Sequence, residues 1–231
     1  MNEHTLSMRL ERVAAHVPAG ARLADIRSDH GYLPVALMRR GAIVAAVAGE
    51  VAQTPFHAAV RTVRDNDLHP FITVRLASGL AAIEPDDEIS AISLCGMGGE
   101  TIRDILDSGK ARLRGHERLI LQPNGGEQPL RQWLMDNGYR ILDEEVLQEN
   151  RFFYEIIVAE RGAPVSYSAE QLYFGPLLMQ ARSPAFIAKW QRLLRQRQKT
   201  LTSFKQARQE VPEEKLEEIS RQIQWITELL A

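Results

Sequence analysis

Residues 22–34 read Arg22-Leu-Ala-Asp-Ile-Arg-Ser-Asp-His-Gly-Tyr-Leu-Pro34, an apolar run of strand length that passes through a polar turn into a helix start. Near the beginning of an α/β pattern, such a strand, turn and helix is where a nucleotide-type domain holds its cofactor. Arg27 stands at the tightest part of the turn, and an arginine does not share the conformational freedom of glycine. The stretch therefore predicts a cofactor turn with one unusual residue.

Further apolar runs of strand length follow this stretch, and segments compatible with helices separate them. The predicted strands are 22–26, 43–49, 72–76, 89–95 and 119–121, and the predicted helices are 33–40, 55–66, 100–108 and 127–137. Leucines and valines spaced three and four apart indicate an opening helix over residues 6–17, which Pro18 ends. The strands are aliphatic or β-branched, which is typical of a parallel sheet covered on both faces. We expect a doubly wound α/β domain.

After Gly138 the pattern changes to two strands, 139–147 and 152–159, joined by the short turn 148–151. This turn is too short for a crossover helix, so the two strands should pair antiparallel. A parallel sheet closed by an antiparallel hairpin is the layout of class I methyltransferases, and it is not the usual ending of a dinucleotide dehydrogenase. The predicted fold is therefore an α/β Rossmann-like sheet of the class I methyltransferase type with a terminal antiparallel hairpin.

The C-terminal third is typical of two heptad-like helices that form an antiparallel, coiled-coil-like hairpin around Pro212. The seam is regular except at Arg197. Charge is divided between the helices, because residues 187–208 hold seven basic and no acidic residues, whereas 210–230 hold six acidic and two basic. The basic helix is either a solvated face paired with its acidic neighbour or a surface that contacts RNA.

Length and composition limit the class of protein. The 231 residues suffice for one domain with an appendage, and we expect a methyltransferase domain over 1–162 and a helical domain over 163–231. The net charge of −2 argues against a uniformly basic nucleic-acid binder. Cys95 is the only cysteine, and the longest apolar run, 42–49, is too short to span a bilayer. The six histidines show no metal-ligand spacing. We expect a cytoplasmic protein, monomeric, without membrane or metal.

The turn after the first strand is the first candidate site. Asp29 and His30 should lie at the carboxyl edge of the sheet, where open α/β folds bind ligands. Backbone N–H groups at such a turn also suit an anionic or zwitterionic ligand. Alternatively, Ser28 and Asp29 only cap the following helix. The glycine fingerprint of dinucleotide enzymes is not present in this turn.

Three further candidates follow later strands. Glu50 ends the second strand, where a carboxylate can accept both hydroxyls of a ribose, although a solvated strand end is also common. The glycine-rich run 95–99 follows the fourth strand and allows close approach of a ligand to the backbone, which favours a cofactor or substrate wall. After the fifth strand, Gln122 and Asn124 flank Pro123 and can offer amide groups to a planar base.

Five short motifs in this order resemble those of the TrmK family, bacterial tRNA (adenine-N1)-methyltransferases that act on the adenosine at position 22. The motifs are Ala24-Asp-Ile-Arg-Ser-Asp-His-Gly-Tyr-Leu-Pro34, Ala48-Gly-Glu50, Gly96-Met-Gly-Gly99, Ile120-Leu-Gln-Pro-Asn124 and Tyr154-Glu-Ile-Ile-Val-Ala-Glu160. The likeness covers nearly the whole chain, including Phe174-Gly-Pro176 and the helical tail. It implies S-adenosylmethionine as cofactor and tRNA as substrate, docked with help from the basic helical hairpin.

The resemblance also implies roles for individual residues. Those expected to bind the cofactor are Asp25, Arg27, Ser28, His30, Glu50, Ser78, Gly79, Gly96 and Met97. The sulfonium is already a good electrophile, so the protein must align adenine N1 with the methyl group and exclude water. Asp29 is the expected catalytic carboxylate, which would stabilise the developing ring charge or accept a proton from the exocyclic amine, and Asn124 would orient the base.

Two positions differ from the family pattern, which has Gly where this chain has Arg27 and Asp where it has Ser78. A serine hydroxyl accepts a hydrogen bond more weakly than a carboxylate. The alternative hypothesis is therefore a catalytically impaired RNA-binding homologue on the same fold. A nucleotide-dependent oxidoreductase is a third hypothesis, disfavoured by the missing glycine fingerprint and by the terminal hairpin.

Overall fold

A mixed sheet forms the centre of the molecule. In the computed structural model, which describes residues 4–206 and 211–231, this sheet has seven strands in the order β3-β2-β1-β4-β5-β7-β6. The strands are β1 (Ala21–Ile26), β2 (Ile43–Glu50), β3 (Ile72–Leu76), β4 (Ala91–Met97), β5 (Arg118–Pro123), β6 (Tyr139–Glu149) and β7 (Phe152–Arg161). Strands β1 to β5 are parallel, and β7 pairs antiparallel with β5 and β6. The predicted class I methyltransferase sheet with its terminal hairpin is confirmed.

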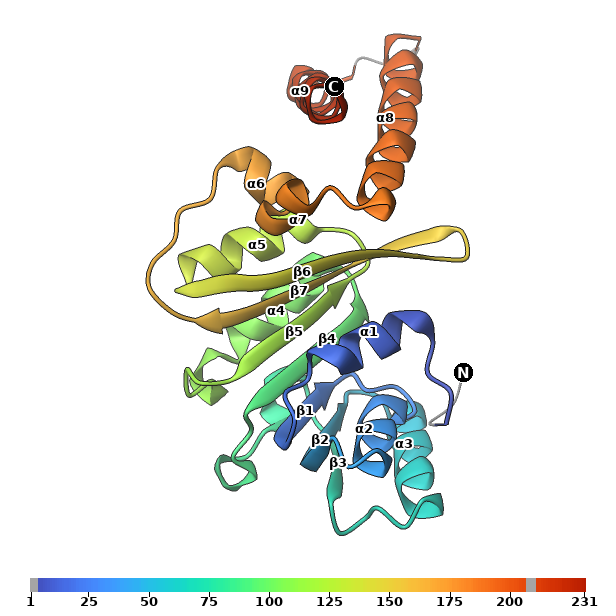
Figure 1. Ribbon diagram of the computed structural model, residues 1–231, viewed down its shortest axis with the longest axis vertical. Helices are drawn as coiled ribbons and strands as arrows, with labels where there is room; N and C mark the ends of the chain where they lie inside the picture. Colours follow the sequence, from blue (N-terminus) through green and yellow to red (C-terminus); the bar gives the residue numbers. More distant parts are fainter. Residues whose placement is uncertain (1–3, 207–210) are drawn as a thin grey trace.

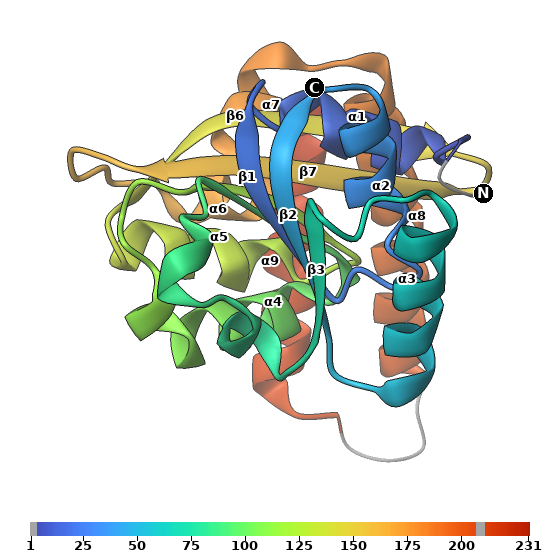
Figure 2. The same cartoon turned by 90° about the horizontal axis from the view of Figure 1, so that it is seen from below.

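Helices cover both faces of this sheet. One face carries α1 (Met8–His16), α2 (Tyr32–Arg39) and α3 (Gln53–Asp65), and the other carries α4 (Gly99–Ser108) and α5 (Glu127–Asp136) (Figures 1 and 2). Short 3-10 turns occur at η1 (Gly79–Ala82), η2 (Pro85–Asp87) and η3 (Lys110–Arg112). The predicted strands and helices of this region are all present, with ends that differ by one or two residues.

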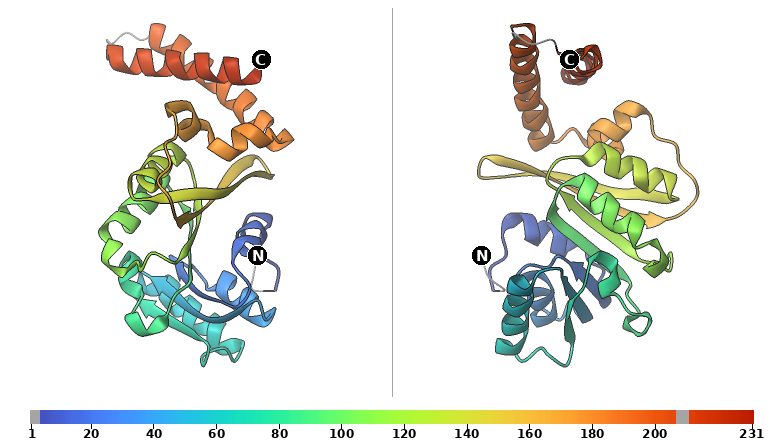
Figure 3. Two further views of the ribbon diagram at one scale, coloured as in Figure 1. Left: turned by 60° about the vertical axis from the view of Figure 1, so that its left-hand side comes forward. Right: turned by 180° about the vertical axis from the view of Figure 1, so that it is seen from behind.

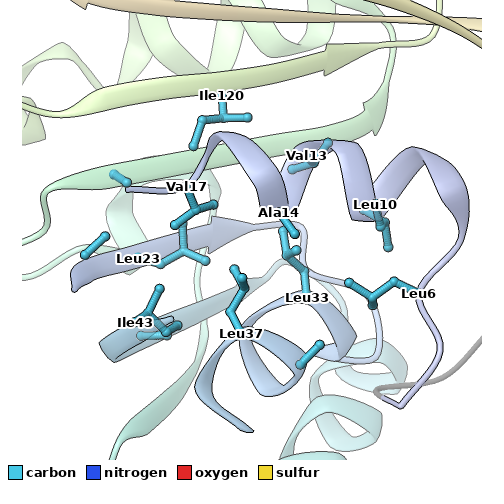
Figure 4. Close-up of a cluster of buried hydrophobic side chains, with 14 of the residues drawn as sticks. Leu6, Leu10, Val13, Ala14, Val17, Leu23, Leu33, Leu37, Ile43 and Ile120 are labelled. Atoms are coloured by element: carbon cyan, nitrogen blue, oxygen red, sulfur yellow. The ribbon is translucent and has the colours of Figure 1, made fainter. Parts of the chain in front are cut away.

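The helix α1 closes the core on its face of the sheet. Ser7 caps it, because its hydroxyl accepts the Leu10 N–H at 3.3 Å. Its apolar side, with Leu10 and Val13, packs towards Leu33 of α2 and Ile120 of β5 (Figure 4). Each such buried aliphatic side chain contributes about 1.5–3 kcal/mol. This packing places α1 along β5, with its N-terminal end next to the candidate site, where Arg9 contacts Gln122.

The chain after β7 forms a separate group of helices beyond the hairpin edge of the sheet (Figures 1 and 3). They are α6 (Ala169–Phe174), α7 (Pro176–Ala181), α8 (Pro184–Lys205) and α9 (Glu213–Leu230), packed around Phe174, Phe186, Trp190 and Ile226. The predicted pair of helices around Pro212 is confirmed. The basic run of the first helix was predicted to end at Arg208, and the acidic run of the second to begin at Glu210. Both residues lie outside the described part of the chain. The sequence did not predict α6 and α7, because six residues are too few to show a helical period.

A buried ion-pair network joins these helices to the sheet. Arg131 of α5 donates to Glu144 of β6 at 2.7 Å and to Glu155 of β7 at 2.6 Å, and all three side chains are buried. Lys189 of α8 pairs with the other oxygen of Glu155. Glu144 also accepts the Leu177 N–H of α7 at 2.9 Å. This network therefore connects the sheet to α5, α7 and α8.

Candidate active site

A cavity of about 580 Å³ opens at the carboxyl ends of β1, β2 and β4. These strands are neighbours in the sheet, so the polar residues that end them meet at one edge. Seven of the residues singled out from the sequence share its wall: Asp25, Arg27, Ser28, Asp29, Glu50, Gly96 and Met97. The structure therefore brings together the first turn, the second strand end and the glycine-rich run.

Two residues in left-handed conformation build the first turn. Arg27 has φ 58° and Asp29 has φ 56°, which costs a non-glycine residue about 1–2 kcal/mol each. The Arg27 N–H donates to the Gly49 carbonyl at 2.8 Å, which ties the turn to the end of β2. The alternative that Ser28 and Asp29 cap α2 is wrong. Gly31 occupies the N-cap position, and no side chain caps that helix.

Asp25 anchors the turn from beneath. Its carboxyl group is buried, and its two oxygens accept the hydroxyl protons of Ser28 and Ser93, each at 2.6 Å. Burial raises the pKa of Asp25, while both serine hydroxyls act in the opposite direction. Ser28 belongs to the turn and Ser93 belongs to β4. By accepting hydrogen bonds from both, Asp25 ties the turn to the sheet beside the cavity.

Glu50 presents the most unusual carboxyl group of the site. It is 3% exposed, and its Oε1 has no hydrogen-bond partner among the described residues. Burial, followed by the negative charge of Asp25, raises its pKa to about 7, although the backbone amide of Asp29 hydrogen-bonds it. A buried acceptor without a donor is unfavourable unless a ligand supplies one. Ribose hydroxyls have this chemistry.

The loop after β4 lines the cavity and is joined by backbone hydrogen bonds to the loop after β5. The Asn124 N–H donates to the Met97 carbonyl at 2.7 Å, and the Gly99 N–H donates to the Gly125 carbonyl at 2.7 Å. A Cβ on Gly99 would lie 2.0 Å from the Gly126 carbonyl oxygen, so no other residue fits. The glycine-rich run therefore allows contact between two loops as well as access for a ligand.

Gln122 is occupied inside the protein, in contrast to its expected contact with a base. It is fully buried, and its Oε1 accepts the Gly96 N–H at 3.0 Å. Its Nε2 donates to Asn124 Oδ1 at 3.1 Å and to the Pro123 carbonyl at 2.8 Å. Asn124 is exposed on the loop, with its amide oriented by Gln122. Gln122 thus positions Asn124.

Four of the described candidates lie beside the cavity and not in its wall: His30, Ser78, Gly79 and Asn124. His30 is half-exposed, stacks on Tyr32 with ring centroids 5.1 Å apart, and lies 2.9 Å from the Asp29 carboxylate. Ser78 is exposed at the start of η1, and the Ala77 N–H ties this loop to the Glu50 carbonyl at 2.7 Å.

Arg9 of α1 belongs to the site, although the sequence did not indicate it. It lines the cavity, donates to Gln122 Oε1 at 2.5 Å, and lies with its guanidinium 5.5 Å from the Tyr154 ring centroid. Its positive charge also acts on Asp25. The periodicity of α1 predicted a packing helix, and nothing in that pattern connects residue 9 with residue 122.

Within residues 4–206 and 211–231, no group of three or more His, Cys, Asp or Glu side chains is arranged to hold a metal ion. In the same part of the chain, no helix has the length and apolar character needed to cross a membrane. Cys95 lines the cavity, and burial raises the pKa of its thiol.

Comparison with known proteins gives close relatives over the full length. The curated tRNA (adenine(22)-N(1))-methyltransferase of Bacillus subtilis is 39% identical over 100% of this chain and 99% of its own. The crystal structure of the B. subtilis m1A22 tRNA methyltransferase TrmK superposes with a TM-score of 0.91 at 36% identity, covering 99% of this chain and 100% of that one.

A third relative was solved with a cofactor. Streptococcus pneumoniae Sp1610 in complex with S-adenosyl-L-methionine superposes with a TM-score of 0.90 at 43% identity, covering 98% of this chain and 100% of that one. The family described as tRNA (adenine(22)-N(1))-methyltransferase, TrmK, matches residues 23–228. The resemblance expected from the sequence is confirmed. On its sequence motifs, its sheet and these relatives, the chain belongs to the TrmK family.

Proposed function

We propose that this protein methylates N1 of the adenosine at position 22 of tRNA, with S-adenosylmethionine as methyl donor. The observation that carries the proposal is Glu50, whose buried and unpartnered oxygen faces a cavity at the strand ends where this fold binds nucleotides. The full-length relatives named above support the reaction and the substrate. The relative solved with S-adenosyl-L-methionine supports the cofactor.

The residues present fit this cofactor. Glu50 would accept the ribose hydroxyls, and the turn at Arg27 and Ser28 would face the amino-acid portion. Gly96, with φ 75° and only Arg9 Nη1 within 4 Å of where a Cβ would stand, at 3.8 Å, allows close approach to the backbone. Ser78 and Gly79 lie on the next loop, where they would border the adenine.

The chemistry required of the protein is alignment and charge stabilisation. The bound cofactor supplies a sulfonium methyl group that is already electrophilic. In the transfer, the adenine N1 lone pair forms the new bond to carbon as the bond from sulfur breaks, so the positive charge passes to the ring. The Asp29 carboxylate at the cavity mouth stabilises that charge, and the Asn124 amide, oriented by Gln122, holds the base in line.

The decisive test is mass spectrometry of nucleosides from tRNA incubated with the protein and S-adenosylmethionine. We expect 1-methyladenosine that maps to position 22, and a transcript with guanosine at this position serves as the control. Protein that is folded and cofactor-bound but forms no 1-methyladenosine in the unmodified tRNA would overturn the proposal.

The alternative of an impaired homologue receives no support from the relatives, and Arg27 allows it to be tested directly. Arg27→Gly removes a left-handed arginine, so we expect the variant to be about 1 kcal/mol more stable. We expect the wild-type protein to bind S-adenosylmethionine within a few-fold of this variant in calorimetry. Binding by the variant alone would favour the impaired homologue.

Other parts of the proposal concern organisation and surroundings. We propose that the methyltransferase domain covers residues 1–162 and the helical domain 163–231, which agrees with β7 ending at Arg161. We also propose a cytoplasmic monomer with a coiled-coil-like C-terminal hairpin that needs no metal, since a sulfonium requires no further activation. Light scattering would give the mass in solution, and turnover should be unchanged by EDTA.

A further inference from the structure

A second cavity, of about 450 Å³, lies between α8, the β6–β7 hairpin and the loop after β5. Gly125 and Gly126 form part of its wall, directly after Asn124 in the chain. Phe153 lines it from the hairpin, and Trp190 and Arg197 line it from α8, which rises beside the hairpin in Figure 1. The two cavities have no lining residue in common, but the loop that carries Gly125 and Gly126 is hydrogen-bonded to the loop after β4, which lines the first cavity.

The wall of this second cavity contains hydrogen-bond donors that lack acceptors. Trp190 is 3% exposed, and its indole Nε1 has no partner among the described residues. Arg197 Nε is likewise buried and without a partner in the described part of the chain. Both groups can only donate, and an unpaired buried donor costs about 1–3 kcal/mol. A ligand with acceptor oxygens would relieve this cost.

The charge of the wall favours an anionic ligand. Arg192, Arg197 and Lys189 contribute positive charge, and Glu127 is the carboxylate that faces them. Lys189 is already neutralised by Glu155. The guanidinium of Arg197 is partly committed to the Tyr173 hydroxyl, which holds it in position. Two arginines thus remain to balance a negative group.

Aromatic side chains at this cavity favour a nucleic acid over a free anion. Phe153 and Tyr173 line it, and the neighbouring Phe152 is 48% exposed beside the Arg151 guanidinium, 5.1 Å from its ring centroid. Exposed aromatic rings next to arginines are the usual means of binding unpaired RNA bases and their phosphates.

We propose that this cavity binds a phosphodiester group of the tRNA, in a nucleotide near the methylated adenosine, with Trp190 and Arg197 as donors. The inference rests on the proposed function. It explains why the predicted apolar seam of α8 is broken at Arg197, because that position faces a ligand site and not only a partner helix. It also gives the basic helix a defined contact rather than a diffuse charge.

The test measures tRNA affinity and KM for variants of the full-length protein. We expect Arg197→Gln to weaken tRNA binding about 10-fold, and to reduce the slope of log affinity against log salt by about one. Trp190→Phe keeps an aromatic ring and loses only the donor, so we expect a loss of about 3-fold. In both variants, the Kd for S-adenosylmethionine should remain within about two-fold of the wild-type value.

Matched controls separate this cavity from general electrostatics. Arg195→Gln removes the same charge from an exposed position of α8 outside the cavity and should change tRNA affinity much less. Gln196→Glu adds a carboxylate to the wall and should weaken binding even if Arg197→Gln folds poorly.

The outcomes are distinguishable. Equal losses for Arg195→Gln and Arg197→Gln would overturn the cavity as a phosphate site. Normal tRNA affinity in Arg197→Gln, Trp190→Phe and Gln196→Glu would do the same, while the wild-type methylation of tRNA would leave the proposed function intact. A wild-type protein that binds no tRNA would overturn both the phosphate site and the proposed function.

Discussion

At the scale of single residues, Glu50 combines a cost in folding stability with the role proposed for it in cofactor binding. Its pKa lies at about 7 in the folded protein, above the usual value of 4.5, because burial and Asp25 disfavour its charge. Between pH 4.5 and pH 7, Glu50 is therefore ionised in the unfolded chain but still protonated in the folded protein. Folding stability falls through that interval and stays lower above pH 7.

Glu50→Gln should reveal this cost. At pH 8 we expect the variant to be more stable than the wild-type protein by on the order of 2 kcal/mol, and the difference should shrink towards pH 5. Wild-type affinity for S-adenosylmethionine should rise between pH 6 and 8 as the carboxylate ionises, and the variant should bind about 10-fold more weakly at pH 8. Urea unfolding and calorimetry at several pH values measure both effects. A stability difference independent of pH would contradict the assignment.

Asp29 supports a prediction about the reaction itself. Asp29→Ala should reduce methyl transfer to a trace while the Kd for S-adenosylmethionine changes by only a few-fold, because the turn is held by backbone contacts and by Asp25. Asp65→Ala is the matched control, since Asp65 is an equally exposed carboxylate at the end of α3 and lies outside the cavity wall. Single-turnover kinetics separate transfer from binding. Undiminished transfer in Asp29→Ala would show that another group stabilises the charge.

At the scale of elements, α1 both packs the core and reaches into the site. Its apolar side was predictable, because the spacing of leucines and valines is local information. The contact of Arg9 with Gln122 joins residues 113 positions apart, and the Ser93–Asp25 hydrogen bond joins residues 68 apart. Strand order decides such contacts, so the sequence pattern could place the site at the sheet edge but could not assign these partners.

Arg9→Met tests the role of α1 in catalysis. Methionine keeps most of the apolar stem but releases Gln122 and, through it, Asn124, so we expect kcat to fall about 10-fold with a stability change below about 1 kcal/mol. Arg12→Met is the control on the same helix, because Arg12 pairs with Glu145 at a half-exposed position. Thermal unfolding and steady-state kinetics compare the two. Equal kcat values for both variants would limit α1 to packing.

At the scale of the whole molecule, the buried network of Arg131, Glu144, Glu155 and Lys189 links the helical region to the sheet. Burial opposes the charge of Glu155, but Lys189 and Arg131 outweigh it and leave the pKa of Glu155 below its usual value. The two regions have different core clusters, and this network joins them together with the apolar contact of Val146 of β6 and the hydrogen bond from Arg192 of α8 to the Arg151 carbonyl. The sequence predicted both regions, but not their junction, since its members come from four separate elements.

Arg131→Met should therefore have a large effect. It leaves two buried carboxylates without their shared partner, and we expect a loss of about 3–5 kcal/mol in the free energy of unfolding. The control is Arg118→Met, which breaks a partly exposed pair with Glu160 and should cost at most about 1 kcal/mol. Denaturant unfolding gives the values, and hydrogen exchange in α8 shows whether that helix is released. Equal losses of unfolding free energy in the two variants would show that the buried network stabilises the protein no more than an exposed ion pair does.

The backbone hydrogen bonds between the loops after β4 and β5 have a thermodynamic consequence. In the proposed function, one loop would border the methyl donor and the other would carry Asn124 towards the acceptor base. The hydrogen bonds from Asn124 to Met97 and from Gly99 to Gly125 couple the two loops. Occupancy of either side then biases the geometry of the other. Such linkage is reciprocal. If bound S-adenosylmethionine raises the affinity for tRNA by some factor, bound tRNA must raise the affinity for S-adenosylmethionine by the same factor.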